Sequence, residues 1–342
     1  WLHRDARYGE KLATPDTSVG DLIGDVDPIK VAEGRTLGDP ETVHYGLVPR
    51  TNRGIFSVNE LPDLPERIQV ALLNILEERD VQIRGYNIRL DLDLLLVASA
   101  NPEDYTNRGR IISPLKDRFG SEVRTHYPED PEQEVAIMHQ EAKAPVAGVP
   151  VVVPPFISEV IAEFTHQLRR SPHINQRSGV SVRFSIGGLE TVTASAVRRA
   201  VRNSETEAVP RVSDLPAAVR SSMGRVEFES FEEGREAEIL EQLARKAIVD
   251  VFRRRLGGFD FSGLLTRFDE GLTVDAGDLV RTEDLLKEIG DVKGVPALLK
   301  RLGVSQESPA IAASSLEFAL EGLHLSKRLN KSPTATGSRY GG

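Results

Sequence analysis

Two short apolar runs in the first half of the chain each end in polar residues. Residues 55–58 (Ile-Phe-Ser-Val) lead into Asn59 and Glu60, and residues 94–98 (Leu-Leu-Leu-Val-Ala) lead into a segment that contains Asn101. Short apolar runs bounded by polar groups are typical of buried strands. A strand buried on both faces suits the centre of a parallel sheet with helices on both sides. The two runs therefore predict neighbouring strands of an α/β fold.

The residues between and after these runs predict further elements of the same region. Pro65 stands at a favourable first helical position, and apolar residues recur at helical spacing over 68–76. Alternating apolar and polar residues predict a hairpin over 81–90. A short helix is expected at 114–119, and the pattern at 122–126 favours one more strand.

The second half of the chain has a mostly helical pattern. Residues 144–155 contain four prolines, so they predict a linker or boundary rather than a helix. Amphipathic helices are predicted at 157–168, 188–201 and 235–256. The final residues, 330–342, are polar and have no means of building a core, so we expect a disordered tail there.

Composition narrows the class of protein. The chain has 342 residues, of which 39% are hydrophobic and 28% charged, which is typical of a globular protein and excludes wholesale disorder. No apolar run approaches the roughly 18 residues of a membrane helix and no signal pattern is present, so we expect a cytoplasmic protein. Cysteine is absent, which excludes disulfides and thiolate chemistry. The net charge of −9 argues against nucleic acid as a partner.

The polar residues after the two apolar runs are the strongest candidates for chemistry. Open α/β sheets bind ligands at the carboxyl ends of their strands. A carboxylate such as Glu60 can act there as a base or hold magnesium, and an amide such as Asn101 can orient water against a phosphate. Taken singly, Glu60 could instead cap a strand, and Asn101 with Pro102 could form a simple turn.

Four motifs occur in one order along the chain: 54–63 (Gly-Ile-Phe-Ser-Val-Asn-Glu-Leu-Pro-Asp), the hairpin 81–90, 94–102 (Leu-Leu-Leu-Val-Ala-Ser-Ala-Asn-Pro) and 114–119 (Pro-Leu-Lys-Asp-Arg-Phe). With them the chain resembles, from residue 1 to about 225, an AAA+ ATPase of the branch that contains the magnesium-chelatase I subunit and the MoxR-type ATPases. The resemblance implies an α/β fold: a partial AAA+ parallel-sheet core of the P-loop type, followed by a helical lid and a helical C-terminal region.

The resemblance also implies a domain organisation. Residues 1–128 would be the C-terminal part of the nucleotide-binding core, and 129–226 the helical lid with the proline-rich linker 144–155. Residues 227–329 would form a helical C-terminal region, followed by the tail at 330–342.

The same resemblance implies roles for individual residues toward ATP and Mg²⁺. Asn59 and Glu60 occupy the Walker B position, where both would lie near the metal and Glu60 would polarise the attacking water. Asn101 matches the sensor 1 residue. Arg118 matches an arginine finger offered to the neighbouring subunit, and Arg183 matches the sensor 2 arginine. A guanidinium suits both arginine roles because its planar fork stabilises charge on a transferring phosphoryl group.

Plainer readings of the two arginines remain open. Arg118 could form a surface ion pair with Asp117 or Glu122, and Arg183 could be a solvated residue at a helix start. The seven histidines show no metal-ligand spacing.

The sequence departs from the family pattern in two places. The first Walker B position is Asn59 rather than an acid, which should weaken metal binding because an amide brings no charge. The phosphate-binding motif Gly-x-x-x-x-Gly-Lys-[Ser/Thr] is absent. In the family that loop lies upstream, so we expect that the chain, which opens on Trp1, lacks an N-terminal portion of roughly one hundred residues.

The leading hypothesis is a subunit of a homo-oligomeric, hexameric ring that couples ATP hydrolysis to the remodelling of a partner protein. In the resembling family that partner often carries a von Willebrand factor A domain, and one subfamily inserts metal into a tetrapyrrole. Asn59 somewhat favours an alternative, a scaffold or regulator of AAA+ shape that does not turn over ATP. A third reading is a transcription activator that acts through sigma factor.

Overall fold

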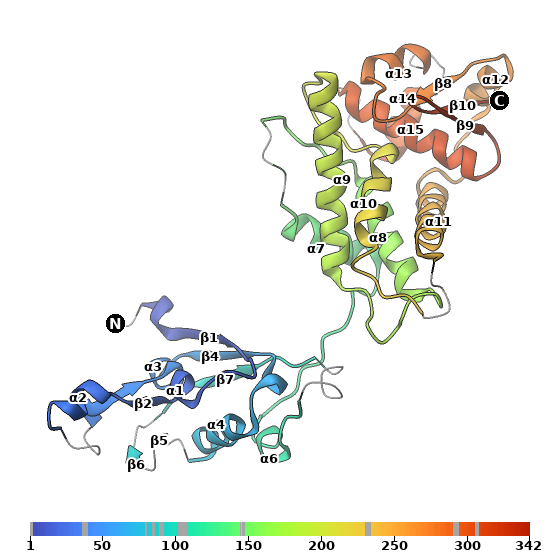
Figure 1. Cartoon of the computed structure of the whole chain (residues 1–342). Coiled ribbons are helices and arrows are strands. Elements are labelled where there is room, and N and C mark those ends of the chain that lie inside the picture. Colours follow the sequence, from blue (N-terminus) through green and yellow to red (C-terminus); the bar gives the residue numbers. More distant parts are fainter. Residues whose placement is uncertain are drawn as a thin grey trace. The chain divides into compact units, whose positions relative to one another are not determined.

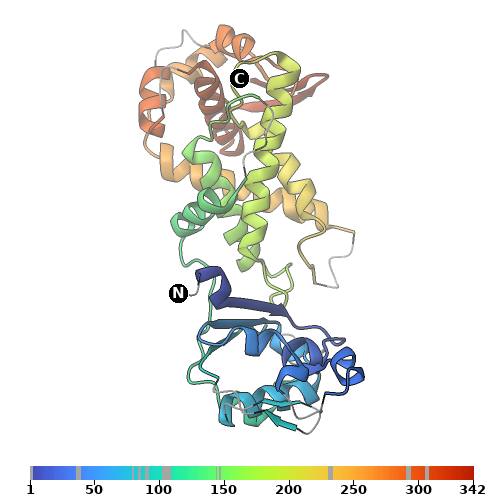
Figure 2. The same ribbon diagram turned by 90° about the vertical axis from the view of Figure 1, so that its left-hand side faces the viewer.

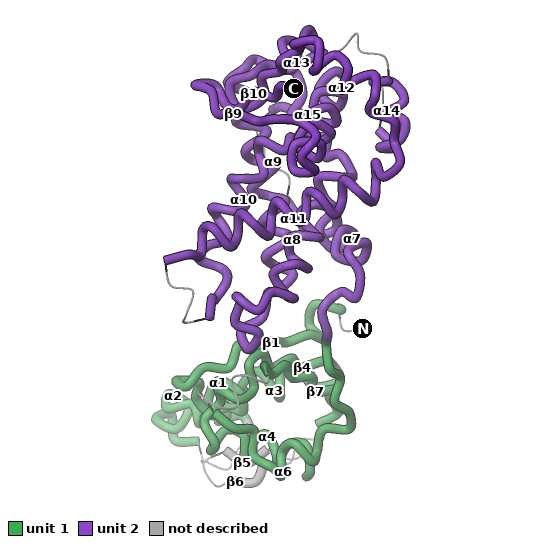
Figure 3. Tube along the Cα trace, turned by 90° about the vertical axis from the view of Figure 1, so that its right-hand side faces the viewer, with its two compact units in different colours: residues 1–125 green, residues 126–342 purple. Residues whose placement is uncertain are grey.

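The computed structural model describes residues 3–35, 40–78, 81–83, 86–88, 92–101, 109–143, 145, 148–229, 234–289, 294–304 and 308–342. The chain divides into two compact units, Trp1–Thr125 and His126–Gly342 (Figure 3). The division falls near residue 128, where the sequence predicts the end of the α/β part.

The first unit mixes short strands and helices (Figure 1). Its strands are β1 (Tyr8–Leu12), β2 (Gly24–Val26), β3 (Val43–Tyr45), β4 (Ile55–Asn59), β5 (Val81–Ile83), β6 (Tyr86–Ile88) and β7 (Leu95–Ala98). Its α-helices are α1 (Val19–Leu22), α2 (Pro28–Ala32), α3 (Leu47–Arg50), α4 (Glu66–Glu78) and α6 (Ser113–Lys116). Short 3-10 helices are η1 (Arg4–Arg7), η2 (Pro40–Thr42) and η3 (Leu61–Asp63).

A parallel sheet organises this unit. Strand β4 lies between β1 and β7 and pairs with both in parallel, with Ile55 opposite Leu95 and Val58 opposite Ala98. The two predicted strands are therefore confirmed as neighbours. The two strands of the predicted hairpin 81–90 are also present, since β5 and β6 pair antiparallel, while residues 84–85 and 89–90 lie outside the described residues. The fold of the unit is α/β, as predicted.

Helix α4 covers one face of the sheet. Its buried residues Ile68, Leu72 and Ile75 recur at helical spacing, and they share one core with Phe56 and Val58 of β4. Side chains alternate along a strand, so Phe56 and Val58 point to the same face. The apolar stripe of the helix and the inward positions of β4 explain why these segments pack together.

The opposite face of the same sheet carries exposed apolar side chains. Five of them, which are 43% to 60% exposed, come from all three strands: Tyr8, Leu12, Ile55, Leu95 and Val97. The prediction of strands buried on both faces is thus wrong for the described residues. Leu95 and Val97, which belong to the apolar run at 94–98, lie on a face of the sheet that no described residue covers.

The second unit is mainly helical (Figure 2). Its helices are α7 (Pro131–Glu141), α8 (Pro155–Arg170), α9 (Val182–Asn203), α10 (Leu215–Ser222), α11 (Glu236–Leu256), α12 (Ser262–Asp269), α13 (Thr282–Ile289), α14 (Val295–Leu302) and α15 (Pro309–Leu325), with a 3-10 helix η4 (Val212–Asp214). Strands β8 (Val274–Ala276), β9 (Asn330–Thr334) and β10 (Gly337–Gly341) form an antiparallel sheet in the order β8-β10-β9.

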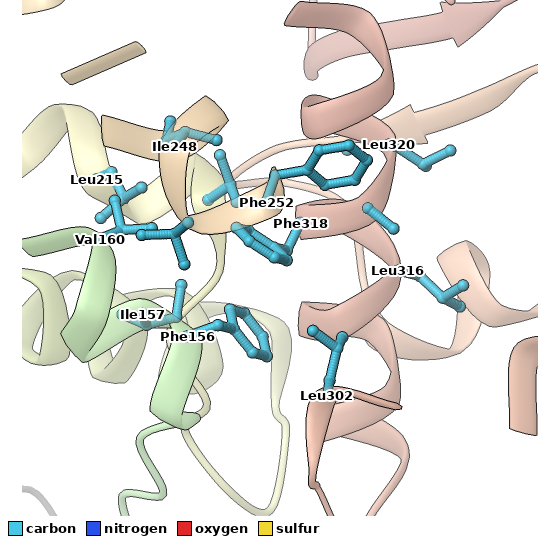
Figure 4. Close-up of a cluster of buried hydrophobic side chains, with 14 of the residues drawn as sticks. Phe156, Ile157, Val160, Leu215, Ile248, Phe252, Leu302, Leu316, Phe318 and Leu320 are labelled. Carbon is cyan, nitrogen blue, oxygen red and sulfur yellow. The ribbon is translucent and has the colours of Figure 1, made fainter. Parts of the chain in front are cut away.

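The predicted lid and the predicted C-terminal region share one core. Phe156 of α8 stacks on Phe318 of α15 with ring centroids 4.6 Å apart, and Phe252 of α11 meets Phe318 edge-on at 6.2 Å (Figure 4). Helices α11 and α15 approach closely at Gly322, where a Cβ atom would lie 2.0 Å from the Phe252 ring. These contacts join residues on both sides of the predicted boundary at 227 into a single unit.

Residues 150–155 of the proline-rich segment are fixed to this unit rather than marking its edge. The Val152 N–H donates to the Ala208 carbonyl at 3.0 Å, and the Ala208 N–H donates to the Pro150 carbonyl at 2.9 Å. Pro155 then begins α8, a position where the missing N–H of proline costs no helical hydrogen bond.

Two sequence predictions fail in regions with few apolar residues. Residues 330–342 do not form a disordered tail, because β9 and β10 pair antiparallel along their length. Tyr340 is only 1% exposed, and its hydroxyl donates to Glu321 at 2.5 Å. The buried side chain of Tyr340 and the backbone pairing of β9 with β10 thus keep this polar segment ordered. The strand expected at 122–126 is absent, and its residues are exposed without strand pairing.

A buried carboxylate ties α7 to α8 and α9. Glu134 accepts two hydrogen bonds from the Arg169 guanidinium, at 2.5 and 2.9 Å, and one from the Ser185 hydroxyl at 2.7 Å. His166 Nε2 lies 3.2 Å from Glu134, although not in hydrogen-bonding geometry. Burial lowers the pKa of His166, and this effect outweighs the opposing attraction of Glu134. Burial therefore disfavours the protonated form of His166 in the folded protein.

A pair of substitutions tests which face of the parallel sheet is the core. Phe56→Ala should lower the free energy of unfolding by about 3–5 kcal/mol, because Phe56 is fully buried. Leu95→Ala removes an exposed side chain and should cost only about 0.5 kcal/mol. Urea titration monitored by amide exchange in β4 measures the loss of unfolding free energy in each variant. Equal losses would contradict the assignment of the buried face.

The buried histidine should make stability depend on pH. Since the folded pKa of His166 lies below its ordinary value of 6.5, protonation favours the unfolded state. The contribution of neutral His166 to the free energy of unfolding is fully present above about pH 6.5. This contribution is lost as the pH falls below that value. His166→Gln should therefore show a smaller drop in unfolding free energy between about pH 7.5 and pH 5.5. The exposed His126→Gln is the control. A drop in His166→Gln as large as in the wild type would contradict this role.

Candidate functional site

The carboxyl ends of β4 and β7 lie side by side and are joined by Ser99. The Ser99 N–H donates to the Val58 carbonyl at 2.9 Å, and the Ser99 carbonyl accepts from the Leu61 N–H at 2.9 Å. The Ser99 hydroxyl accepts from the Glu60 N–H and donates to Asn59 Oδ1, both at 3.3 Å. Sequence reasoning missed this residue. In the sequence, only its position between the apolar run at 94–98 and Asn101 indicated that Ser99 could belong to the site.

Glu60 has an unusual backbone conformation. Its φ of 57° and ψ of 49° place it in the left-handed region, where side chains other than glycine are uncommon. Such a conformation costs on the order of 1 kcal/mol and persists only when its surroundings enforce it, as the bonds to Ser99 and Leu61 do here. The Glu60 carboxylate makes no capping bond to η3 and is partly exposed. Strained residues of this kind cluster at functional sites.

The two strand ends present one carboxylate and two amides to the same edge. Asn101 is exposed three residues beyond β7. Asn59 is also exposed, but its amide oxygen already accepts the Ser99 hydroxyl. Among the described residues, no group of three or more His, Asp or Glu side chains could hold a metal. Magnesium commonly uses one or two carboxylates together with phosphate oxygens and water, so Glu60 fits a nucleotide-bound Mg²⁺ better than Asn59 does.

Gln69 is a second residue that sequence reasoning missed. It is buried in α4, and its amide donates to the carbonyls of Leu64 at 2.9 Å and Arg110 at 3.0 Å while accepting from the Ile112 N–H at 2.9 Å. Gly109 lies so close to Pro62 that a Cβ atom would be 2.1 Å from the Pro62 carbonyl oxygen. Gln69 thereby holds residues 109–112 against the segment that follows Glu60. A buried polar residue on an apolar helix face was the only signal.

Arg118 lies apart from this edge. It follows α6, and its Nη2 pairs with Glu77 Oε1 at 2.6 Å, rather than with Asp117 or Glu122. This partner raises the pKa of Arg118. Glu77 stands near the end of α4, and eleven residues at about 1.5 Å each place it roughly 16 Å along the helix from Glu66, where the helix begins. The partner that the structure gives Arg118 thus lies near the C-terminal end of α4, and among the described residues no hydrogen bond or ion pair joins Arg118 to Glu60.

Arg183 belongs to the second unit. It lies in the first turn of α9, which begins after Ser181, and the Ser181 hydroxyl accepts from the Arg183 N–H at 3.2 Å. The Arg183 side chain is exposed and makes no hydrogen bond or ion pair within the part of the chain that is described. Asn59, Glu60 and Asn101 thus lie at or just beyond the ends of the neighbouring strands β4 and β7, whereas Arg118 pairs with Glu77 and Arg183 lies in the second unit.

Residues 34–118 match the family model of the sigma-54 interaction domain, an AAA+ module. The matched region contains β4, α4 and β7 and so includes the edge described above. The match and the parallel sheet support an AAA+ ATPase-type module in the first unit. No curated protein matches the chain. Among the described residues, no helix is long and apolar enough to cross a membrane.

Solved structures with weak similarity include a candidate ATPase from Cytophaga hutchinsonii, at 18% identity and a TM-score of 0.30, covering 70% of this chain and 77% of that one. NtrX from Brucella abortus aligns at 17% identity and a TM-score of 0.42, covering 78% of this chain. NtrX with ADP aligns at 17% and 0.39, covering 86%. The chain spans 58% of each NtrX structure. With TM-scores below 0.5, these likenesses carry no functional argument.

Proposed function

We propose that the chain is part of an AAA+ ATPase that uses ATP hydrolysis to remodel a partner protein. The observation that carries the proposal is the strained Glu60, held by Ser99 at the end of the central parallel strand. Open α/β sheets bind ligands at the carboxyl ends of their strands, and residues with a strained backbone cluster at functional sites. A glutamate with a strained backbone at this edge is therefore a candidate for the hydrolytic base. The family match over 34–118 supports the same class of protein.

Each residue of the edge has a distinct part in the proposed reaction. Glu60 would accept a proton from, or polarise, the water that attacks the terminal phosphate. The Asn101 amide would orient that water or a phosphate oxygen. Asn59 would hold the Ser99 hydroxyl in place and contribute little to a metal. Mg²⁺ bound with the nucleotide would neutralise phosphate charge, and Glu60 is the carboxylate available to it.

Arg118 is proposed to act on the nucleotide of a neighbouring subunit. It is 42% exposed, lies two residues beyond α6 and is paired with Glu77, which is 46% exposed. An exposed ion pair exchanges partners easily, because water screens both charges. A homo-oligomeric ring, hexameric in the family that the sequence resembles, would bring this guanidinium to a phosphate across the subunit interface.

The identity of the remodelled partner divides the proposal into two branches. The motif order resembles the magnesium-chelatase and MoxR-type ATPases, which favours a partner with a von Willebrand factor A domain. The match of residues 34–118 to the sigma-54 interaction domain favours a second candidate, a regulator that acts on a sigma factor. Binding of the purified protein to each type of partner in the presence of ATP separates the two branches.

Substitution of Glu60 tests the proposed base. In the protein made from its complete gene, Glu60→Gln should leave the fold and nucleotide binding intact and reduce ATP turnover at least about 100-fold, because the amide cannot accept the proton. Glu78→Gln, an exposed acid at the end of α4, is the control and should hydrolyse ATP like the wild type. Equal turnover in Glu60→Gln and the wild type would overturn the assignment. A wild type that binds no nucleotide would favour the scaffold alternative.

Mixed rings test whether Arg118 acts across an interface. Arg118→Ala alone and Glu60→Gln alone should both be inactive. A mixture of the two should regain part of the activity, because some interfaces then combine an intact Glu60 with an intact Arg118 from the neighbour. Arg124→Ala, which removes a nearby exposed arginine paired with Glu122, is the control. A mixture as inactive as its components, in rings of normal size, would contradict action across the interface.

A further inference from the structure

Five charged side chains meet in the interior of the second unit, where η4 packs against α9 and α15. The group consists of two cations and three acids: Arg199, Arg211, Glu205, Asp214 and Glu317. Four of them are at most 2% exposed, and the side chain of Glu205 is 11% exposed. If all three acids were ionised, the group would hold one negative charge in excess. An uncompensated charge in the interior is costly, so one of the three carboxyl groups is a candidate to keep its proton.

Two of the acids are surrounded by donors that favour the charged carboxylate. Glu205 accepts from the N–H and the hydroxyl of Thr282, both at 2.8 Å. It also accepts from the guanidinium groups of Arg199 at 3.2 Å and Arg211 at 3.3 Å. Asp214 accepts from the Arg199 guanidinium at 3.1 Å and from the Arg211 N–H at 2.9 Å. Hydrogen bonds to the charged form stabilise it, so Glu205 and Asp214 are the carboxylates that match the two arginines.

Glu317 has far fewer donors. Its Oε1 accepts from the Ser213 N–H at 2.6 Å, and its Oε2 has no hydrogen-bond partner among the described residues. A buried carboxylate oxygen without a donor is costly, whereas a protonated carboxyl needs an acceptor instead. The Ser213 hydroxyl and Asp214 Oδ1, two oxygens of η4, likewise lack a partner within the described ranges. The pattern of donors and acceptors therefore favours a proton on Glu317.

The electrostatic surroundings act in the same direction. Burial raises the pKa of Glu317, and the attraction of Arg211 and Arg199 opposes this effect only in part. The next cation along this wall, Lys331 of β9, donates to Glu321 at 2.6 Å. The hydroxyl of Tyr340 donates to the same carboxylate at 2.5 Å. Glu321 thus takes the charge of Lys331, and Glu317 gains no cation from β9 or β10.

The remaining charged groups around α15 lie at the surface or have partners. Arg245 and Glu241 of α11 pair with each other at 3.5 Å, and Asp278 pairs with Arg198 at 3.7 Å. His324 of α15 bonds to the Leu329 carbonyl at 3.1 Å. The other charged groups on neighbouring elements are exposed to water, which screens them: Arg202 of α9, Arg220 of α10, and the charged residues of α13 and α14.

We propose that Glu317 keeps its proton in the folded protein at neutral pH and forms an alkaline-sensitive lock between η4 and α15. With this proton the buried group is neutral, because two cations face two carboxylates. Loss of the proton leaves a buried negative charge without a partner, so the second unit becomes less stable as the pH rises. The lock lies wholly in the second unit and does not depend on the proposed ATPase function.

The direction of the pH dependence follows from the two states of the chain. In the unfolded chain Glu317 ionises at its ordinary pKa of 4.5, so folding above that pH takes up one proton. The stability that Glu317 contributes is fully present below about pH 4.5 and is lost as the pH rises through the folded-state pKa. Glu317→Gln keeps the shape of the protonated carboxyl and the bond from Ser213, and it cannot ionise.

Urea titrations of the intact chain, followed by NMR signals of α15, measure this effect. The ratio of the wild-type unfolding constant to that of Glu317→Gln should rise about tenfold for each pH unit between about 5.5 and 7, because one proton is linked to folding. His166 titrates in both proteins, so its effect cancels in the ratio. Glu163→Gln removes a buried acid of α8 that pairs with Arg254 at 2.8 Å. This variant is the control, and its ratio should not rise.

Infrared spectroscopy reads the protonation state directly. The difference spectrum of wild type minus Glu317→Gln at pH 7 should contain the carbonyl band of a protonated carboxylic acid, and this band should shift in heavy water. The corresponding spectrum for Glu163→Gln should contain carboxylate bands instead.

Either of two results would overturn the proposal. One is a ratio of wild type to Glu317→Gln that stays constant between about pH 5.5 and 7. The other is a set of carboxylate bands in place of the acid band in the Glu317→Gln difference spectrum. If Glu317→Gln does not fold, wild-type protein labelled with ¹³C in its glutamate carboxyl groups decides the question. An isotope-shifted acid band at pH 7 supports the proposal, and its absence contradicts it.

Discussion

The parallel pairing of β4 with β7 is the contact on which the candidate site depends. It places two strand ends at one edge, and Ser99 then fixes both by bonding to Val58, Glu60 and Leu61. These bonds hold Glu60 in a left-handed conformation that the residue would not adopt alone. Because the backbone is already fixed, binding of a ligand to Glu60 need not pay the entropic cost of ordering this part of the main chain.

A second constraint governs the other unit, where charged groups are buried in pairs. Arg199 and Arg211 are almost fully buried among Glu205, Asp214 and Glu317. Arg211 and Glu205 also bond to Thr282, the first residue of α13. Removing one member of such a network leaves an uncompensated buried charge, so the network fixes the relative positions of α9, η4 and α13. Glu317 Oε2, beside this network, has no hydrogen-bond partner among the described residues.

The sequence was sufficient for features that depend on local pattern. Apolar runs identified β4 and β7 as neighbouring strands, and the polar residues Glu60 and Asn101 follow their ends. Features that depend on long-range contacts were not predictable. Ser99 and Gln69 act through bonds to residues about 40 positions away, and sequence spacing gives no sign of them.

The same limit explains the errors in the second unit. Phe156 and Phe318 stand on opposite sides of the predicted boundary at 227, and their rings stack. Residues on both sides of that boundary therefore belong to one compact unit. The hairpin of β9 and β10 is stabilised by backbone pairing and one buried tyrosine, Tyr340, which a polar composition conceals. The apolar pattern predicts that sheet residues such as Leu95 are buried, yet Leu95 is exposed. The pattern alone cannot show which residues cover a strand.

The central claim is that Glu60 and Asn101 act together on one phosphate. A double-mutant cycle of ATP turnover with Glu60→Gln and Asn101→Ala tests it most directly. Residues that act as a unit are strongly non-additive, so the double variant should be about as slow as the slower single variant. If instead the two losses multiply, the residues act independently and the account of a shared site at the edge of β4 and β7 is wrong.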